Sequence, residues 1–175
     1  MIVLLAGLPG TGKTTLAREL AARTSGRVLS KDEFRHALFL PEEIEYSSAQ
    51  DDFCLQVMLE TAEYLLRRDQ GRAVFLDGRP FSRRYQIENV LAVAQALHQP
   101  WRILECVCSE ERAKRRLEAD GSSGRHLAGN RDFSLYLEVK ARFEAITLPK
   151  TVIDTDQALE SCVLLALKSL NHEGR

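Results

Sequence analysis

A glycine-rich segment close to the N-terminus constrains the fold more than any other feature of the chain. Residues 7–14 read Gly-Leu-Pro-Gly-Thr-Gly-Lys-Thr and match the pattern G-x-x-x-x-G-K-[ST]. An apolar run at residues 2–6 precedes the segment, and a helical pattern at residues 13–23 follows it. In this context the glycines let successive backbone N–H groups face a phosphate, and the helix N-terminus adds its positive dipole end. The segment therefore predicts a nucleotide-binding P-loop.

The positions of the predicted P-loop have different tasks. Lys13 is expected to reach the outer phosphates of ATP, and the Thr14 hydroxyl is expected to ligate Mg²⁺. Thr15, in the first helical turn, is expected to help hold the α-phosphate. The predicted nucleotide-binding residues of this segment are Gly7, Leu8, Pro9, Gly10, Thr11, Gly12, Lys13, Thr14 and Thr15. The motif predicts nucleotide binding but no single activity, because GTPases, ATPases and kinases all carry it.

The whole chain alternates apolar runs of strand length with longer helical patterns. Runs that are apolar almost throughout are typical of a parallel sheet covered by helices on both faces. With short links between them, they predict one doubly wound α/β domain over residues 1–175. The predicted strands are Ile2–Ala6, Arg27–Leu29, Ala73–Leu76, Ile103–Cys108 and Thr151–Ile153. The predicted helices are Lys13–Arg23, Asp32–Leu38, Ser48–Arg68, Arg84–Leu97, Ser109–Glu118, Phe133–Ala145 and Gln157–Leu170.

Two segments stand out from this alternation. In the longest predicted helix, Ser48–Arg68, we expect Phe53, Val57 and Tyr64 to lie on one apolar face. The leucines of the helix are expected to widen this apolar stripe. Residues 120–132 instead hold three glycines, two serines and two arginines, with almost nothing to bury. We therefore expect a loop over residues 120–132.

Composition and charge limit the possible partners and the compartment. The 24 Lys and Arg residues against 25 Asp and Glu give a net charge of −1, so no overall cationic field would gather nucleic acid or coat an anionic membrane. No segment approaches the length of a membrane span, and the short apolar N-terminus lacks the basic residues of a signal peptide. The four cysteines form no Cys-x-x-Cys pair and are interpreted as buried thiols in a reducing compartment. We expect a cytoplasmic protein.

Asp32 and Arg35 follow the second predicted strand and have two interpretations. Asp32 could simply cap the helix that starts here, as could Ser30. Alternatively, because residues three apart share a helical face, Asp32 could accept the proton of a hydroxyl while Arg35 holds or polarises the same acceptor. The spacing alone leaves the two interpretations equal.

Asp77 ends the third predicted strand and precedes Gly78 and Arg79. This position is the carboxyl edge of the sheet, where open α/β folds bind their ligands. Asp77 could hold the Mg²⁺ shell or cap the turn before Gly78, and the strand ending favours the functional role. Arg79 is the best candidate for contact with an acceptor.

These motifs resemble the AAA-domain family of small P-loop kinases, whose relatives include the polynucleotide 5′-kinase domain, chloramphenicol phosphotransferase and adenylylsulfate kinase. The resemblance covers nearly the whole chain. It extends over the P-loop, Asp32 with Arg35, Leu76-Asp77, Arg-Arg-Leu at 115–117, Arg142-Phe143-Glu144 and Val-Ile-Asp-Thr at 152–155. It implies a P-loop NTPase fold with a five-stranded parallel sheet and a mobile lid. It also implies that Asp32 is the general base and that Arg35 contacts the acceptor.

The resemblance also assigns the lid and the adenine site. It places Arg112 and Arg116 at the base of a lid over residues 120–132, where Arg116 matches the arginine of the family that meets ATP, and it places Asp154–Thr155 beside the adenine. Relatives commonly carry an arginine three residues after the Arg-Leu pair, where this chain has Asp120. For that reason Arg125 and Arg131 are both candidates for the catalytic lid arginine.

The sequence as a whole predicts an ATP- and Mg²⁺-dependent kinase that phosphorylates a hydroxyl of a small molecule or a nucleic-acid end. The alternative is a nucleotide-dependent switch or regulatory ATPase that binds a partner protein, although no guanine-recognition Asn-Lys-x-Asp string is present. Arg35 and Arg79 are expected to face the γ-phosphate together. Without acidic partners they would favour an anionic acceptor, whereas pairing with Glu33, Asp77 or another carboxylate would remove that preference.

Overall fold

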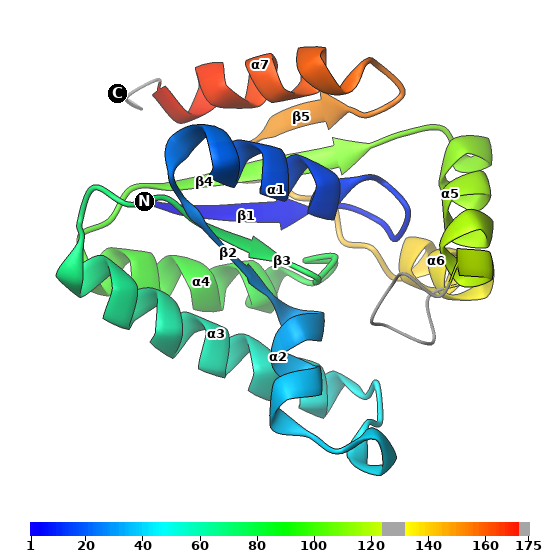
Figure 1. Cartoon of the computed structure of the whole chain (residues 1–175), viewed down its shortest axis with the longest axis horizontal. Helices are drawn as coiled ribbons and strands as arrows, with labels where there is room; N and C mark the ends of the chain where they lie inside the picture. The colour runs from blue at the N-terminus through cyan, green and yellow to red at the C-terminus, as the bar shows by residue number, and fades with distance from the viewer. Residues whose placement is uncertain (124–131, 172–175) are drawn as a thin grey trace.

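A five-stranded parallel sheet with the strand order β2-β3-β1-β4-β5 forms the centre of the computed structural model, which describes residues 1–123 and 132–171 (Figure 1). This confirms the predicted parallel α/β architecture. The strands are β1 (Ile2–Ala6), β2 (Arg27–Ser30), β3 (Val74–Asp77), β4 (Trp101–Val107) and β5 (Thr151–Asp154). The helices are α1 (Lys13–Thr24), α2 (Lys31–Leu38), α3 (Ser48–Arg68), α4 (Arg84–Ala96), α5 (Glu110–Ser123), α6 (Phe133–Ala141) and α7 (Leu159–Asn171), with a short 3₁₀ turn η1 at Pro41–Glu43.

The central strand β1 is buried along its whole length between β3 and β4. Successive side chains of a strand point to opposite faces, so Val3 and Leu5 pack into the layer of α1 and α7. Ile2 and Leu4 pack into the opposite layer, which α3 and α4 cover (Figure 1). Burial on both faces explains why β1 is apolar throughout.

The buried face of α3 differs from the prediction. Phe53 and Tyr64 are 49% and 58% exposed, whereas the leucines expected only to widen the stripe form the buried face together with Cys54 and Met58. Phe53 instead packs edge-on against Phe39 at 5.9 Å between ring centroids. The leucines, Cys54 and Met58 therefore face the core, and the two aromatic rings are exposed.

Helix α5 also differs from the prediction, because it continues to Ser123 and does not end at Glu118. The first residues of the segment expected to be a loop, 120–123, are therefore helical. Each residue added to an existing helix gains a hydrogen bond, which here outweighs the low propensity of Gly121 and the serines. Residues 124–131, the rest of the predicted lid, lie outside the described part of the chain. Within that described part, no helix is both long and apolar enough to cross a membrane.

All five strands run in the same direction, so their carboxyl ends meet at one edge of the sheet. The segment after β1 is the P-loop, β2 leads into α2, and β5 leads into Thr155. Asp77 is the last residue of β3 and pairs in register with Ser30 at the end of β2. The fold thus brings residues that are far apart in the sequence to a common edge.

Candidate functional site

The P-loop is packed so tightly that only glycine fits at two of its positions. Gly7 has a φ of 129°, and a Cβ there would lie 2.2 Å from the Cys106 carbonyl oxygen. Gly10 has a φ of 78°, and a Cβ there would lie 2.8 Å from the carbonyl oxygen of Ala113 on α5. The hydroxyl of Thr11 donates to the Leu8 carbonyl at 2.7 Å, which closes the loop from within. The shape of the loop is therefore fixed by its own contacts and by the elements around it.

Lys13 lies inside the curve of the P-loop, as its predicted role requires. Its Nζ donates to the carbonyl oxygens of Gly7 and Leu8 at 2.9 and 2.7 Å. The side chain is largely buried, so its charge is held at the loop and away from bulk water. Lys13 and Thr14 both line a cavity on the α3 and α4 side of the loop, and Thr14 also lines a second cavity on the other side.

The second cavity has a volume of about 400 Å³ and is lined by six of the residues predicted to bind the nucleotide: Gly10, Gly12, Thr14, Thr15, Arg116 and Thr155. Arg116 of α5 spans it by donating to the Gly10 carbonyl at 3.3 Å and to the Thr155 hydroxyl and carbonyl at 3.0 and 2.9 Å. The Thr155 hydroxyl lies 3.0 Å from the Thr11 carbonyl, to which it donates. Arg116 and Thr155 thus join α5 and the segment after β5 to the P-loop, while Thr15 is exposed along the rim of the cavity.

Arg112 and Asp154 are not among the residues that line either cavity in the described part of the chain. Arg112 Nε pairs with Asp156 at 2.9 Å. The backbone N–H of Ser109 donates to Asp156, and this bond, followed by other contacts including Arg112, lowers the pKa of the Asp156 carboxyl. Asp154 accepts from the Asp156 N–H at 2.9 Å and so holds the turn after β5. Both side chains support the loop that carries Thr155.

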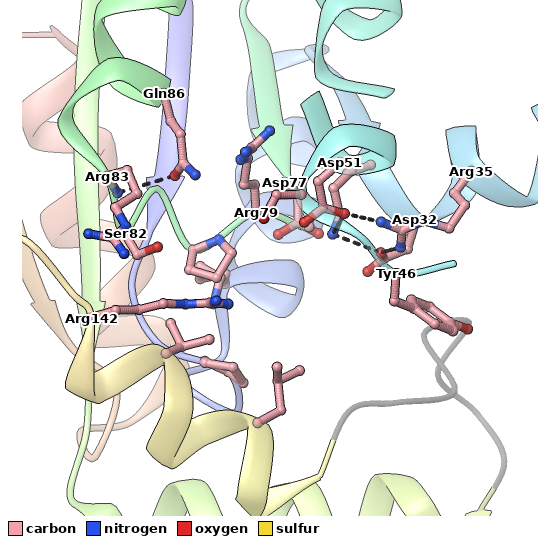
Figure 2. Close-up of a pocket in the computed structure, with 18 of the residues that line it drawn as sticks. Asp32, Arg35, Tyr46, Asp51, Asp77, Arg79, Ser82, Arg83, Gln86 and Arg142 are labelled. Atoms are coloured by element: carbon pink, nitrogen blue, oxygen red, sulfur yellow. Dashed lines mark hydrogen bonds and ion pairs between the residues drawn. The ribbon is translucent and has the colours of Figure 1, made fainter. Parts of the chain in front are cut away.

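The first cavity has a volume of about 220 Å³ and joins the phosphate side of the site to the predicted acceptor side (Figure 2). Lys13 and Thr14 line it together with the four predicted acceptor residues, Asp32, Arg35, Asp77 and Arg79. Its remaining lining comes from segments that the sequence did not assign to the site. These are Tyr46 and Asp51 around the start of α3, Ser82, Arg83 and Gln86 around the start of α4, and Leu135, Val139 and Arg142 of α6 and its C-terminal end.

Asp32 belongs to a buried ion-pair network and does not cap α2 (Figure 2). Ser30 occupies the N-cap position, and its side chain makes no capping hydrogen bond. The Asp32 carboxylate lies 3.0 Å from Arg35 and 3.5 Å from Lys31. Asp51, from the first turn of α3, pairs with the same two cations, at 2.7 Å from Lys31 and in close contact with Arg35. The capping interpretation of Asp32 is therefore wrong.

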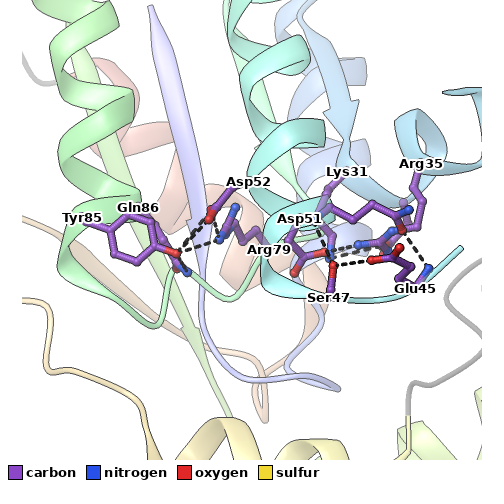
Figure 3. Close-up of polar contacts among 11 residues, drawn as sticks. Lys31, Arg35, Glu45, Ser47, Asp51, Asp52, Arg79, Tyr85 and Gln86 are labelled. Carbon is purple, nitrogen blue, oxygen red and sulfur yellow. Dashed lines mark hydrogen bonds and ion pairs between the residues drawn. The ribbon is translucent and has the colours of Figure 1, made fainter. Parts of the chain in front are cut away.

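Arg79 also has a carboxylate partner, which favours the second of the two interpretations of the Arg35–Arg79 pair, that carboxylates already neutralise both arginines. Its Nη2 lies 2.6 Å from Asp52, which the Tyr85 hydroxyl also contacts (Figure 3). Arg35 pairs with Asp32 and Asp51, so the preference of an Arg35–Arg79 pair for an anion is lost. The sequence could not show this, because Asp51 and Asp52 reach the site only through the packing of α3 against the sheet.

Asp77 is suited to a metal ion. The side chain is 1% exposed, and its Oδ1 has no hydrogen-bond partner among the described residues. A buried carboxylate oxygen without a partner is costly unless a cation lies close to it. Asp77 lines the same cavity as Thr14, so these two residues fit a Mg²⁺ site. Among the described residues there is no cluster of three acidic, histidine or cysteine side chains that could hold a metal ion.

The two candidate lid arginines, Arg125 and Arg131, lie outside the described residues, so their predicted role stays a prediction. Sequence reasoning missed Tyr46, whose ring lies under the Arg35 guanidinium at 4.9 Å from the centroid, and whose φ is 51°. Positive φ is uncommon at a residue other than glycine, asparagine or aspartate. No local sequence signal marks Tyr46 or Asp51 as part of the site.

Comparisons with known structures concern the fold of the chain. The structure is similar to the APS kinase CysC of Mycobacterium tuberculosis in complex with AMPPNP and APS, at 18% identity and a TM-score of 0.73, with 98% of this chain and 97% of that chain covered. It is also similar to a gluconokinase of Sinorhizobium meliloti, at 17% identity and a TM-score of 0.68, with 97% of this chain and 90% of that chain covered. A third similar structure is Chaetomium thermophilum Kti12 in complex with ADP-AlF3, at 16% identity and a TM-score of 0.71, with 100% of both chains covered. At these identities the likeness shows the fold, which is that of a P-loop NTPase.

No curated protein matches the chain by sequence. A family model does: the model described as an AAA domain matches residues 2–145, which include the P-loop, the acceptor-side residues Asp32 and Asp77, and Arg116. The chain therefore belongs to this AAA-domain family of P-loop proteins.

Proposed function

We propose that the protein is an ATP-dependent kinase that transfers the γ-phosphate to a hydroxyl group. The observation that supports this most is the shared cavity, which is lined by Lys13 and Thr14 on one side and by Asp32 and Asp77 on the other. A phosphoryl acceptor must lie in line with the γ-phosphate in a space from which water is excluded. A switch that only hydrolyses its nucleotide needs room for one water molecule, and this cavity is larger.

The proposed roles follow from the contacts of each residue. Lys13, which the P-loop carbonyls hold in place, stabilises negative charge on the outer phosphates. Asp32 accepts the proton of the acceptor hydroxyl, and Lys31 and Arg35 fix the orientation of its carboxylate. Asp77 and Thr14 hold Mg²⁺, which neutralises phosphate charge when it is bound. Arg116 and Thr155 hold the nucleotide on the far side of the loop.

The test is ATP consumption across a library of sugars, nucleosides, antibiotics and 5′-hydroxyl oligonucleotides, with the product identified by ³¹P NMR. Acceptor-dependent turnover that disappears in Lys13→Ala is expected. Tight ATP binding without turnover on any acceptor would contradict the proposal and favour the alternative, a nucleotide-dependent switch or regulatory ATPase with a partner protein.

A further inference from the structure

Arg142 lines the acceptor cavity and was not predicted as a site residue from its spacing or position. It is the residue that ends α6, and its guanidinium reaches from that helix toward the middle of the pocket (Figure 2). Its side chain makes no hydrogen bond, ion pair or ring contact with any residue that the structure describes.

The other cations around the cavity already have partners. Four of them are paired with carboxylates: Lys31 with Asp32 and Asp51, Arg35 with the same two, Arg79 with Asp52, and Arg83 with Glu144. Lys13 is held by the P-loop and serves the nucleotide. Of the six cations that line the cavity in the described chain, Arg142 is thus the one whose charge no carboxylate or loop carbonyl offsets.

The nearest carboxylate in the sequence, Glu144, is not available to Arg142. It accepts from the Arg84 backbone N–H at 2.7 Å and from Arg83 at 3.0 Å. These bonds, the backbone bond first, lower the pKa of Glu144 and so hold it as an anion at the N-terminus of α4. The turn that brings Glu144 to α4 therefore leaves the exposed Arg142 side chain at the cavity without a counter-ion among the described residues.

Two further residues that line the cavity, Arg79 and Ser82, have polar side-chain groups without a hydrogen-bond partner among the described residues. Arg79 is 2% exposed, and its Nε and Nη1 have no partner among the described residues although Nη2 is paired. The Ser82 side chain is 6% exposed, and its hydroxyl makes no hydrogen bond within the described chain. A buried guanidinium with unused N–H groups is costly unless a ligand oxygen accepts from them.

We propose that the acceptor carries an anionic group, a phosphate or a carboxylate, which Arg142 binds while the acceptor hydroxyl lies at Asp32. A guanidinium can offer two parallel N–H groups to such an anion. This inference rests on the proposed kinase function. It assigns the binding of the anion to Arg142. The sequence alone suggests Arg35 and Arg79 for this role, but carboxylates neutralise the charges of both.

The test compares neutral acceptors with related acceptors that carry an anionic group. The pairs are glycerol and glycerol 3-phosphate, glucose and gluconate, and adenosine and 3′-AMP. For an anionic acceptor that the wild-type protein phosphorylates, Arg142→Gln should raise the KM for that acceptor roughly 10- to 100-fold, which is the loss expected for a hydrogen bond between charged groups. The kcat and the KM for ATP should stay nearly unchanged. Arg142→Lys should recover part of the loss. The control is Arg67→Gln on α3, an exposed arginine paired with Glu63, which should change nothing.

A binding measurement decides the inference without turnover. Protein saturated with Mg²⁺ and AMPPNP is titrated with sodium sulfate at constant ionic strength and followed by ¹H–¹⁵N NMR. Saturable shifts at Arg142 and Ser82 that disappear in Arg142→Gln are expected. Preference for neutral acceptors, an equal effect of Arg142→Gln on both members of a pair, or sulfate shifts that survive Arg142→Gln would overturn the inference. Absence of turnover with every acceptor would instead count against the proposed kinase function, and the titration would still decide the role of Arg142.

Discussion

Asparagine substitutions at Asp32 and Asp51 separate the proposed chemistry of Asp32 from its structural role. Both carboxylates belong to the same buried network and contact the same two cations, Lys31 and Arg35. Each substitution removes one negative charge and leaves the network with an excess positive charge. Both residues line the cavity, but only Asp32 is proposed to take a proton from the acceptor.

The geometry predicts different costs in stability. Removing one partner of a fully buried ion pair costs about 3–5 kcal/mol. Asp51 makes two close ion pairs but its side chain is 23% exposed, so we expect Asp51→Asn to cost about 2–3 kcal/mol. Asp32 is within hydrogen-bond distance of Arg35 alone, since Lys31 lies 3.5 Å away, and we expect about 1–2 kcal/mol.

The expected effects on turnover are in the opposite order: Asp32→Asn should lower kcat more than Asp51→Asn. Loss of a general base costs roughly 10²- to 10⁴-fold, and the loose transition state of phosphoryl transfer favours the lower end of that range. Asp51→Asn acts through Lys31 and Arg35, which hold Asp32, and should lower kcat less than about tenfold. Urea denaturation gives the stabilities, and kcat with the Kd for ATP is measured under conditions where each variant is fully folded. Equal losses of kcat in the two variants would refute the assignment of Asp32 as the base.

Three further predictions concern the nucleotide side and the core. Lys13→Ala should lower turnover by about 10³-fold or more while the protein stays folded by circular dichroism, because Lys13 contacts the P-loop and not the core. Arg116→Ala should weaken ATP binding about tenfold in calorimetry, and Arg112→Ala less, because Arg116 alone of the two joins α5 to the P-loop. Burial raises the pKa of Cys106 to about 12, so mass spectrometry should find it unmodified by iodoacetamide at pH 8 until the protein unfolds. This folded pKa lies above the unfolded value of 9.0, so the buried neutral thiol contributes a stability that is complete below pH 9 and is lost as the pH rises toward 12.

The parts of the fold that could be predicted are those with a local cause. The run Ile2–Ala6 is apolar because β1 is buried on both faces, and its predicted bounds match the strand. The P-loop has its predicted position because its motif is complete within eight successive residues, although the carbonyls that exclude a Cβ at Gly7 and Gly10 belong to the distant residues Cys106 and Ala113. The position of Asp77 at the edge of the sheet followed from the strand ending alone.

The parts that could not be predicted depend on how distant segments pack. Asp51 and Asp52 follow the N-cap of α3 in the sequence, and nothing local distinguishes them from residues that support the helix terminus. They neutralise Arg35 and Arg79 only because α3 lies across the ends of β2 and β3. Arg142 belongs to a motif that the sequence shares with the family. That no carboxylate of the described residues pairs with it depends on Glu144, which bonds to the N-terminus of α4 instead.

The two halves of the proposed reaction differ in the same way. The nucleotide half depends mainly on a local motif, and the acceptor half depends on the packing of distant segments. The nucleotide half is built from the P-loop, which many P-loop proteins share, and from Arg116 and Thr155, which close around it. The acceptor half is built by α2, α3, α4 and α6. Carboxylates of α2 and α3, together with Glu144 after α6, neutralise most of the cavity charge and leave Arg142 without a carboxylate partner among the described residues. Substitutions on these helices should therefore change which acceptor is used while ATP affinity stays the same. Because the P-loop fixes the phosphate position independently of these helices, the identity of the acceptor depends on the side chains of the helices and not on the nucleotide motif.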